Sequence, residues 1–173
     1  MCCPITTKEV EDDGDPDVRS GINTASFHLQ SRCNDTIWPE TQAGAGNLQL
    51  INGGPQLKPG QNLTAAAPNG WSAINIWGRQ WCSFDQSSKG SWLTSDCGSN
   101  LQCGGAGGEP PATLAEFTVY GPLGFYNDSL VDRFNLPVLI IPHGGSGQCR
   151  AVRWVRELNA KEERTVACKS ASM

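Results

Sequence analysis

The chain has 173 residues, enough for one domain with a sizeable core and too few for two. It contains 20 glycines and 11 prolines, and only 17% of its residues are charged, which indicates a turn-rich protein. Residues 25–173 carry 11 basic and 11 acidic side chains, so this neutral body gives no electrostatic reason to expect nucleic acid or a membrane as a partner. No apolar run reaches the roughly 18 to 20 residues of a membrane helix, and no signal peptide is expected in this chain.

The net charge of −4 lies entirely in residues 1–24. This polar segment lacks apolar periodicity, which predicts a disordered acidic leader before a single domain over residues 25–173. Cys2 and Cys3 fall on this leader, and we expect them to be an uninvolved pair rather than a lipidated or metal-binding tip.

Eight cysteines leave three possibilities: metal binding, redox chemistry or disulfide bonds. Their spacing lacks the paired CxxC blocks of a zinc site, so disulfides are favoured and no metal or other cofactor is expected. Disulfides require an oxidising compartment, which conflicts with the missing signal peptide.

From Ala25 onward, short apolar segments alternate with Gly, Pro and Asn, which is typical of antiparallel strands packed as a sandwich. Residues 112–120 and 131–141 are predicted strands, joined by a connection over residues 121–128. Residues 149–164 have helical spacing, with apolar residues every three positions, and predict one short peripheral helix.

Two carboxylates are associated with the predicted strands. Alternation in the first strand places Ala115, Phe117 and Val119 on one face and Glu116 on the other. Asp132 would share a face with its apolar neighbours, so a bend or bulge is needed to turn it outward.

Three sequons begin at Asn34, Asn62 and Asn127, and the sequence does not decide which of them are glycosylated. His28 and His143 stand far apart without a nucleophile motif near either, so both are expected to be structural.

Seven blocks follow one another along the chain. They are SFHLQSRCNDTIWP, NGWSAINIWGRQWCSFD, LTSDCGSNLQCGG, PPATLAEFTVYG, FYNDSLVDRFNLPVLIIP, GGSGQCRAV and VACKSA. Their order and spacing resemble those of the thaumatin-like proteins, the fifth class of plant pathogenesis-related proteins. The resemblance covers about residues 25–171 and is to the short form, which lacks most of the second domain, here with a truncated C-terminus. It implies a flattened antiparallel β-sandwich, secretion to the extracellular space or apoplast, and an acidic cleft associated with fungal-wall β-1,3-glucan.

The resemblance also implies the disulfide pattern. Cys97 and Cys103 keep both members of a familial pair, whereas the expected partner of Cys33 would lie beyond Met173. Tryptophan or serine occupies three positions where the family has cysteine: Trp92, the expected partner of Cys82, together with Trp154 and Ser172. The pairing of the remaining cysteines therefore stays open; they are Cys2, Cys3, Cys33, Cys82, Cys149 and Cys168.

By the same resemblance, the cleft residues fall on Arg79, Glu116 and Asp132, with Asn127 in place of a further aspartate and Asp128 beside it. Phe125, Tyr126 or Trp81 would pack against a sugar ring. Hydrolysis would need Glu116 as acid and Asp132 as base or nucleophile. A nearby Arg79 would lower a carboxylate pKa, which favours binding over catalysis, although a surface ion pair among these groups is an equal alternative.

These patterns predict a monomeric, antifungal defence protein that binds β-1,3-glucan or another cell-wall polysaccharide. Three alternatives remain open. They are a weak endo-β-1,3-glucanase, an inhibitor of a microbial hydrolase such as a xylanase, and a degenerate inactive copy.

Overall fold

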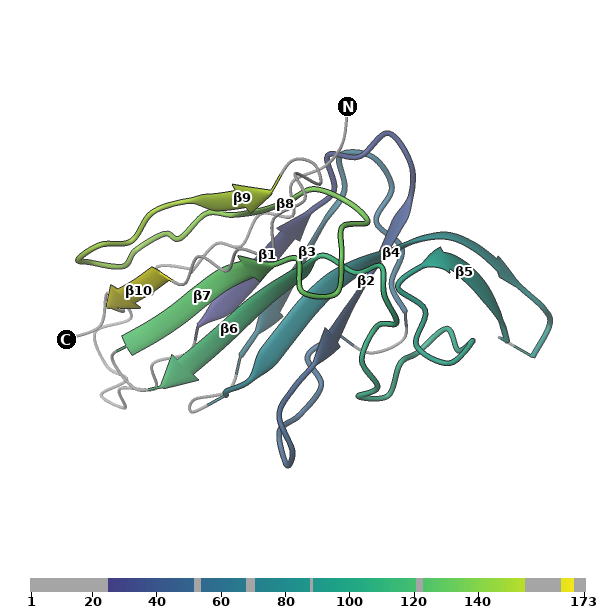
Figure 1. The fold of residues 1–173 in the computed structure, drawn as a ribbon, viewed down its shortest axis with the longest axis horizontal. Helices are drawn as coiled ribbons and strands as arrows, with labels where there is room; N and C mark the ends of the chain where they lie inside the picture. The colour runs from purple at the N-terminus through teal and green to yellow at the C-terminus, as the bar shows by residue number, and fades with distance from the viewer. Residues whose placement is uncertain are drawn as a thin grey trace, which may run out of the picture.

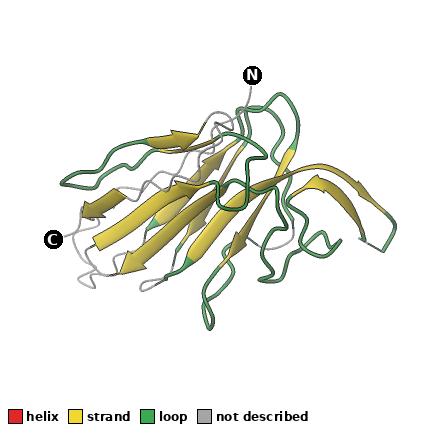
Figure 2. Ribbon diagram, viewed as in Figure 1, coloured by secondary structure: helices red, strands yellow, loops and turns green. Residues whose placement is uncertain are grey.

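The computed structural model describes residues 25–51, 54–67, 71–87, 89–120, 123–154 and 166–169. The predicted leader, with Cys2 and Cys3, lies outside these residues. Ten strands and no helix form the described part of the chain (Figures 1 and 2). The strands are β1 (Ser26–Gln30), β2 (Ile37–Gln42), β3 (Asn62–Ala66), β4 (Ile74–Phe84), β5 (Gly90–Thr94), β6 (Leu114–Tyr120), β7 (Leu123–Ser129), β8 (Val138–Ile140), β9 (Val152–Trp154) and β10 (Val166–Lys169).

The larger sheet is antiparallel, in the order β10-β7-β6-β4-β2, with β5 also paired to β4. The long strand β4 pairs with two strands, β6 and β5, along one of its edges. Asn75 pairs with Glu116 of β6, whereas Gln80 pairs with Thr94 of β5 and, on the other edge, with Ile37 of β2. The sheet thus bends from its main body toward a separate β4–β5 hairpin (Figure 1).

Two small sheets, β1-β3 and β8-β9, form the second layer of a sandwich. The core between the layers contains alternate residues from both sides, as expected where each sheet buries one face. It comprises, among others, Phe27, Leu29, Ile74, Ile76, Ala115, Phe117, Val138, Ile140 and Val152, all buried. The predicted all-β antiparallel sandwich is confirmed.

The strand prediction around Glu116 is confirmed, but the following connection is wrong. Residues 123–129 form strand β7, which pairs with β6 from Leu123↔Tyr120 to Ser129↔Leu114. Gly, Asn and Asp suggested a loop there, yet a full ladder to β6 overrides these weak strand propensities. Of the predicted strand over residues 131–141, only β8 is a strand.

The predicted peripheral helix is wrong where the structure describes it. Val152 and Trp154 alternate with Arg153, and this period of two allows β9 to pair with β8. Pairing with β8 satisfies the backbone groups that a helix would have bonded internally. Residues 155–165 lie outside the described residues. No helix in the described part is long and apolar enough to cross a membrane.

Cysteine pairing confirms one prediction and answers part of what the sequence left open. Cys97 and Cys103 form the expected disulfide. Cys33 and Cys149 are each disulfide-bonded as well. Cys82 is a free thiol whose pKa is raised by burial.

Candidate functional site

Cross-strand register aligns four polar side chains across the larger sheet. Gln42 of β2 lies opposite Asn75 of β4, Asn75 opposite Glu116 of β6, and Glu116 opposite Asn127 of β7. Directly opposed residues of antiparallel strands point to the same face, so these four form one row, which we call the polar row. At about 4.8 Å between strands, the row is roughly 14 Å long.

The polar row is linked internally but remains partly open to solvent. Asn127 donates from Nδ2 to Glu116 Oε2 at 2.7 Å, and Asn75 donates from Nδ2 to Gln42 Oε1 at 3.4 Å. All four side chains are half-buried. Amides can both donate and accept hydrogen bonds, and a carboxylate accepts at both oxygens, so the row presents a mixed surface suited to hydroxyl groups.

The two ends of the polar row differ. Phe125, on the same face of β7 as Asn127, has 40% of its surface exposed and offers an aromatic face. At the other end a glycine-rich loop covers the sheet. An added Cβ at Gly107 would lie 3.3 Å from Gln42 Oε1, and one at Gly108 would lie 2.6 Å from Trp77 Nε1. The loop therefore approaches the row closely because it carries no side chains there.

Arg79 lies away from the polar row and is fully buried. Its Nη2 forms an ion pair with Glu40 Oε1 at 2.8 Å, and both side chains are almost inaccessible to solvent. The guanidinium also donates to the carbonyls of Asn100 and Leu101 at 3.1 and 2.9 Å. It stacks on the Trp92 ring, with 3.9 Å between Arg79 Cζ and the ring centroid. We call this group the Arg79 clamp.

The Arg79 clamp holds the disulfide loop to the sheet, because Asn100 and Leu101 lie between Cys97 and Cys103. Burial raises the pKa of Glu40, and the positive charge of Arg79 opposes that shift. Burial likewise lowers the pKa of Arg79, which Glu40 opposes. Both charges are therefore stabilised chiefly by each other. The prediction of Arg79 beside Glu116 is not supported, since Glu40, 39 residues upstream, occupies its guanidinium.

Asp132 lies in a turn beyond the end of β7 and does not join the polar row. Arg133, the next residue, has a φ of 68°, so the chain does bend here, as the alternation required. The Asp132 carbonyl accepts a hydrogen bond from the Ala112 amide at 2.8 Å. Ala112 precedes Glu116 by four residues, which is about 13 Å of extended chain, so the backbone of Asp132 lies well away from Glu116.

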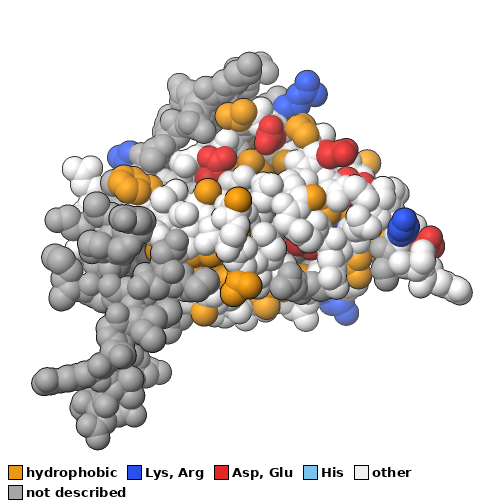
Figure 3. All heavy atoms as spheres, turned by 90° about the horizontal axis from the view of Figure 1, so that it is seen from below, with side chains coloured by type: hydrophobic (Ala, Val, Ile, Leu, Met, Phe, Trp, Pro, Cys, Tyr) orange, Lys and Arg blue, Asp and Glu red, His pale blue; other side chains and the backbone are white. Residues whose placement is uncertain are grey.

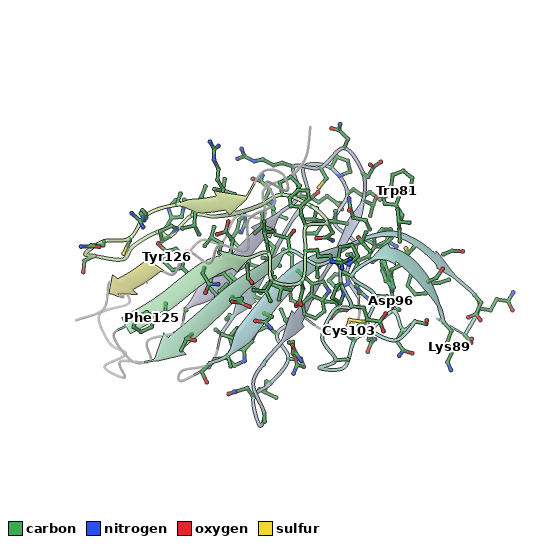
Figure 4. All side chains as sticks on the ribbon, viewed as in Figure 1. Trp81, Lys89, Asp96, Cys103, Phe125 and Tyr126 are labelled. Atoms are coloured by element: carbon green, nitrogen blue, oxygen red, sulfur yellow. A yellow bond between two sulfur atoms is a disulfide. The ribbon has the colours of Figure 1, made fainter. Side chains whose placement is uncertain are left out.

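Two other predicted ligand residues lie on the core face of β7, because alternation separates them from Phe125 and Asn127. Tyr126 is buried, and its hydroxyl donates to the Arg150 carbonyl and accepts from the Arg150 amide. Asp128 is 1% exposed. In Figure 4, Phe125 and Tyr126 project from different sides of β7.

Gln42 and Asn75 were not among the predicted site residues. Their own segments contain no recognisable motif, and only the strand register brings them beside Glu116. The sequence does mark one of these two residues, Asn75, as facing outward. Asn75 interrupts an apolar run between Ile74 and Ile76, which marks the outward face of β4.

Comparison with known proteins places this sandwich in a family. The thaumatin family matches residues 31–173. The pathogenesis-related thaumatin-like protein 3.5 of Cryptomeria japonica is 44% identical over 154 residues, which cover 84% of this chain and 63% of that protein. The pathogenesis-related protein 5 of Arabidopsis thaliana is 44% identical over 167 residues, covering 89% and 68%.

A solved structure, that of a thaumatin-like xylanase inhibitor, aligns with a TM-score of 0.63 and 29% identity, covering 82% of this chain and 89% of that one. Fold and sequence therefore define a thaumatin-like sandwich, and the chain belongs to the thaumatin family. It spans about two thirds of the length of the curated relatives it matches, 63% and 68% for the two named above.

Proposed function

We propose that this protein is an extracellular defence protein that binds β-1,3-glucan through the polar row. The observation that carries the proposal is the alignment of four half-buried polar residues across four strands: Gln42, Asn75, Glu116 and Asn127. Sugar hydroxyls both donate and accept hydrogen bonds, and this mixture of amides with one carboxylate complements them. A row about 14 Å long accommodates a short run of linked sugar rings.

The composition of the polar row favours a neutral ligand. Three of its four side chains are uncharged amides. On the face of the molecule seen from below in Figure 3, most described side chains are likewise uncharged, with acidic and basic groups scattered among them. Phe125, exposed at one end of the row, supplies the apolar surface against which a sugar ring packs. Association with such a ligand depends on hydrogen bonds and packing rather than on long-range attraction, so it should vary little with salt.

The same geometry argues against hydrolysis as the main activity. Glycoside hydrolysis generally takes two carboxyl groups about 5 to 9.5 Å apart on either side of the bond. Glu116 is the single carboxylate of the polar row, and an amide, Asn127, faces it. Asp132 lies in the turn beyond β7. We therefore propose a binding protein rather than a glucanase.

Co-sedimentation with insoluble β-1,3-glucan tests this proposal. Wild-type protein should pellet with the glucan and not with cellulose. Glu116→Gln should weaken binding about fivefold, since a hydrogen bond to a charged group is worth about 1 kcal/mol more than one to a neutral group. Asp132→Asn, on the turn outside the row, is the matched control and should bind as wild type does.

Failure to pellet from a folded sample would contradict the glucan proposal. Loss of binding in Asp132→Asn but not in Glu116→Gln would move the site away from the polar row. Release of reducing sugar that Glu116→Gln abolishes would support the enzyme instead.

Inhibition of a microbial hydrolase is a second candidate, supported by the structural match to a thaumatin-like xylanase inhibitor. A separate surface fits it. Trp81 is 62% exposed and Leu93 is 69% exposed on the β4–β5 hairpin, and Trp81 projects away from β4 in Figure 4. Large exposed apolar side chains of this kind mark protein interfaces.

A xylanase assay with added protein tests the second candidate, with Trp81→Ala and Phe125→Ala as a pair. If inhibition occurs through the hairpin, Trp81→Ala abolishes it and Phe125→Ala does not. Phe125→Ala should weaken glucan binding, and Trp81→Ala should leave it unchanged. If a folded sample neither binds glucan nor inhibits the xylanase, the protein is an inactive family copy.

A further inference from the structure

We infer that Asn34 and Asn62 are N-glycosylation sites and that Asn127, the third sequon, stays unmodified. The inference rests on the extracellular destination in the proposed function, because the glycan is attached in the secretory route. All three sequons satisfy the sequence rule, so only their placement in the fold distinguishes them.

The sequon at Asn62 presents both of its essential groups to solvent. Asn62 begins β3, and residues two apart on a strand share a face. Asn62 and Thr64 are accordingly both exposed, while Leu63 between them is half-buried. The Thr64 hydroxyl is hydrogen-bonded to His28 Nδ1 at 2.9 Å, in a contact that is open to solvent. An enzyme can therefore reach the amide and the hydroxyl from one side.

The sequon at Asn34 lies in the turn between β1 and β2. Asn34 and Asp35 are exposed and Thr36 is half-buried. Exposed turns with polar residues carry modifications without loss of packing, because their side chains already face water.

The sequon at Asn127 lies within strand β7 and is engaged at both of its essential positions. Asn127 donates from Nδ2 to Glu116 Oε2 at 2.7 Å, so the nitrogen that would carry the glycan is already hydrogen-bonded. Ser129 is 1% exposed, so its hydroxyl cannot be read from solvent. A glycan on Asn127 would also cover the middle of the sheet and the polar row.

The order of folding supports the same distinction. In the larger sheet β7 pairs with β6, and beyond β6 lie β4 and β2. All three of these strands come before Asn127 in the chain. Hairpins form in about 1 to 10 μs, whereas synthesis adds about 5 to 20 residues per second. The β6–β7 ladder therefore has time to form while the chain is still being made.

The two inferred glycans lie together, away from the proposed ligand site. Asn62 pairs with Gln30 at the end of β1, and the Ser31 amide donates to the Gln61 carbonyl at 2.9 Å, which places Asn34 near the same end. The opposite end of β1 lies toward Phe125, since Ser26 and Phe125 line one cavity. Glycosylation at Asn34 and Asn62 thus leaves the polar row open.

The reaction is a group transfer from a lipid pyrophosphate-linked oligosaccharide. A bond forms between the asparagine amide nitrogen and C1 of the first sugar, and the bond from C1 to the phosphate oxygen breaks. The amide loses one proton, and the lipid pyrophosphate leaves with the bonding electron pair. No oxidant or reductant is required.

Translation of the full chain behind a cleavable signal peptide, in the presence of microsomes, tests the inference independently of glucan binding. The wild type should gain two glycan-sized increments on a denaturing gel, both removed by an endoglycosidase. Asn34→Gln and Asn62→Gln should each lose one increment, and Asn127→Gln should lose none. Thr36→Ala and Thr64→Ala, which keep the asparagines, should reproduce the first two losses.

A loss of one increment in Asn127→Gln would overturn the inference, as would an unmodified Asn34 or Asn62. Because the folded sheet is what withholds Asn127, a variant that fails to fold should gain an increment there. Limited proteolysis of each translated variant therefore shows first that it folds as the wild type does. Glucan binding plays no part in this readout, so a failure of the glycosylation inference can be distinguished from a failure of the proposed function.

Discussion

The polar row and the Arg79 clamp occupy the same sheet and share a strand, but they differ in access to solvent. Asn75, in the row, is half-buried, whereas Arg79, four residues further along β4, is 0% exposed. The row leaves hydrogen-bonding groups open to a ligand. In the clamp, Glu40, two carbonyls and the Trp92 ring surround one guanidinium.

This difference shows that polar residue type alone does not define a binding site in this sheet. An arginine and a carboxylate can bind a ligand only if they are hydrated in the free protein, so that the ligand can replace that water. In the Arg79 clamp the two side chains already lost their water when the protein folded. We therefore expect clamp variants to lower stability and row variants to lower binding, and the predictions below test that separation.

The largest expected effect is on the clamp. Arg79→Met leaves Glu40 buried without its counter-charge, which should lower the free energy of unfolding by about 3 to 5 kcal/mol. Arg150→Met, which removes an exposed arginine, should change it by less than about 0.5 kcal/mol. Urea unfolding measures both. The double variant Glu40→Leu, Arg79→Met should be more stable than Arg79→Met alone, because no charge is then left unpaired.

Equal unfolding midpoints for Arg79→Met and Arg150→Met would contradict the clamp. The pH dependence offers a second check, because burial raises the pKa of Glu40 and Arg79 opposes that shift. Without Arg79 the folded-state pKa should rise further. A raised carboxyl pKa favours folding below its unfolded value of about 4.3, and this contribution is lost as pH rises through the folded value. The deficit of Arg79→Met should therefore grow between about pH 4 and pH 7.

A pair of neighbouring glycines gives an intermediate effect. The Cβ of Gly108→Ala would meet Trp77 Nε1 at 2.6 Å, and Trp77 is fully buried, so overpacking should cost about 1 to 3 kcal/mol. In Gly107→Ala the nearest atom is Gln42 Oε1 at 3.3 Å, at the mobile end of a side chain. That variant should keep its stability and lose glucan affinity. Equal melting temperatures for both variants would show that the loop does not pack as described.

The row itself should contribute little to stability. Glu116→Gln keeps an oxygen that accepts from Asn127 Nδ2, so the free energy of unfolding should stay within about 0.5 kcal/mol of wild type. Thermal unfolding checks this in the same sample that is used for glucan binding. A large loss of stability would place Glu116 with the clamp as a structural residue.

The smallest expected effect lies in the β4–β5 turn. Asp85 accepts hydrogen bonds from the Ser87 hydroxyl and from the Ser87 and Lys89 amides, and these lower its pKa. A lowered folded-state pKa means that the contribution is present above the unfolded value and is lost as pH falls through the folded one. The protection factor of the Lys89 amide, which is the exchange rate corrected for its intrinsic pH dependence, should fall on acidification. In Asp85→Asn the protection factor should be lower at neutral pH and should lose that acid-induced step; an unchanged protection factor would contradict the contact.

Much of the fold was predictable because apolar alternation is a local signal. The alternation of Ala115, Phe117 and Val119 predicts Glu116 on the opposite face of the strand, and in β6 Glu116 is half-buried between the buried Ala115 and Phe117. Strand β7 was missed because Asn127 and Asp128 have low strand propensity and only the ladder to β6 holds them extended. The helix was predicted because Val152, Val155 and Leu158 repeat every three residues. It is wrong at its start because Val152 and Trp154, two residues apart, lie on strand β9, which pairs with β8.

The site was only partly predictable because it depends on contacts distant in sequence. Gln42 reaches Asn75 through the register of β2 with β4, and nothing near either residue indicates this pairing. The family resemblance implied Arg79 as a cleft residue, and its ion pair with Glu40, 39 residues upstream, could not be predicted from sequence. Burial of both side chains is a property of the assembled sheet.

A nuclear magnetic resonance titration with a soluble β-1,3-linked gluco-oligosaccharide tests the central claim most directly. The side-chain amide signals of Gln42, Asn75 and Asn127 should shift in a saturable way, while the Nε–H signal of Arg79 should not move. Shifts at Arg79 and the disulfide loop, with an unperturbed polar row, would contradict the separation of binding site from clamp.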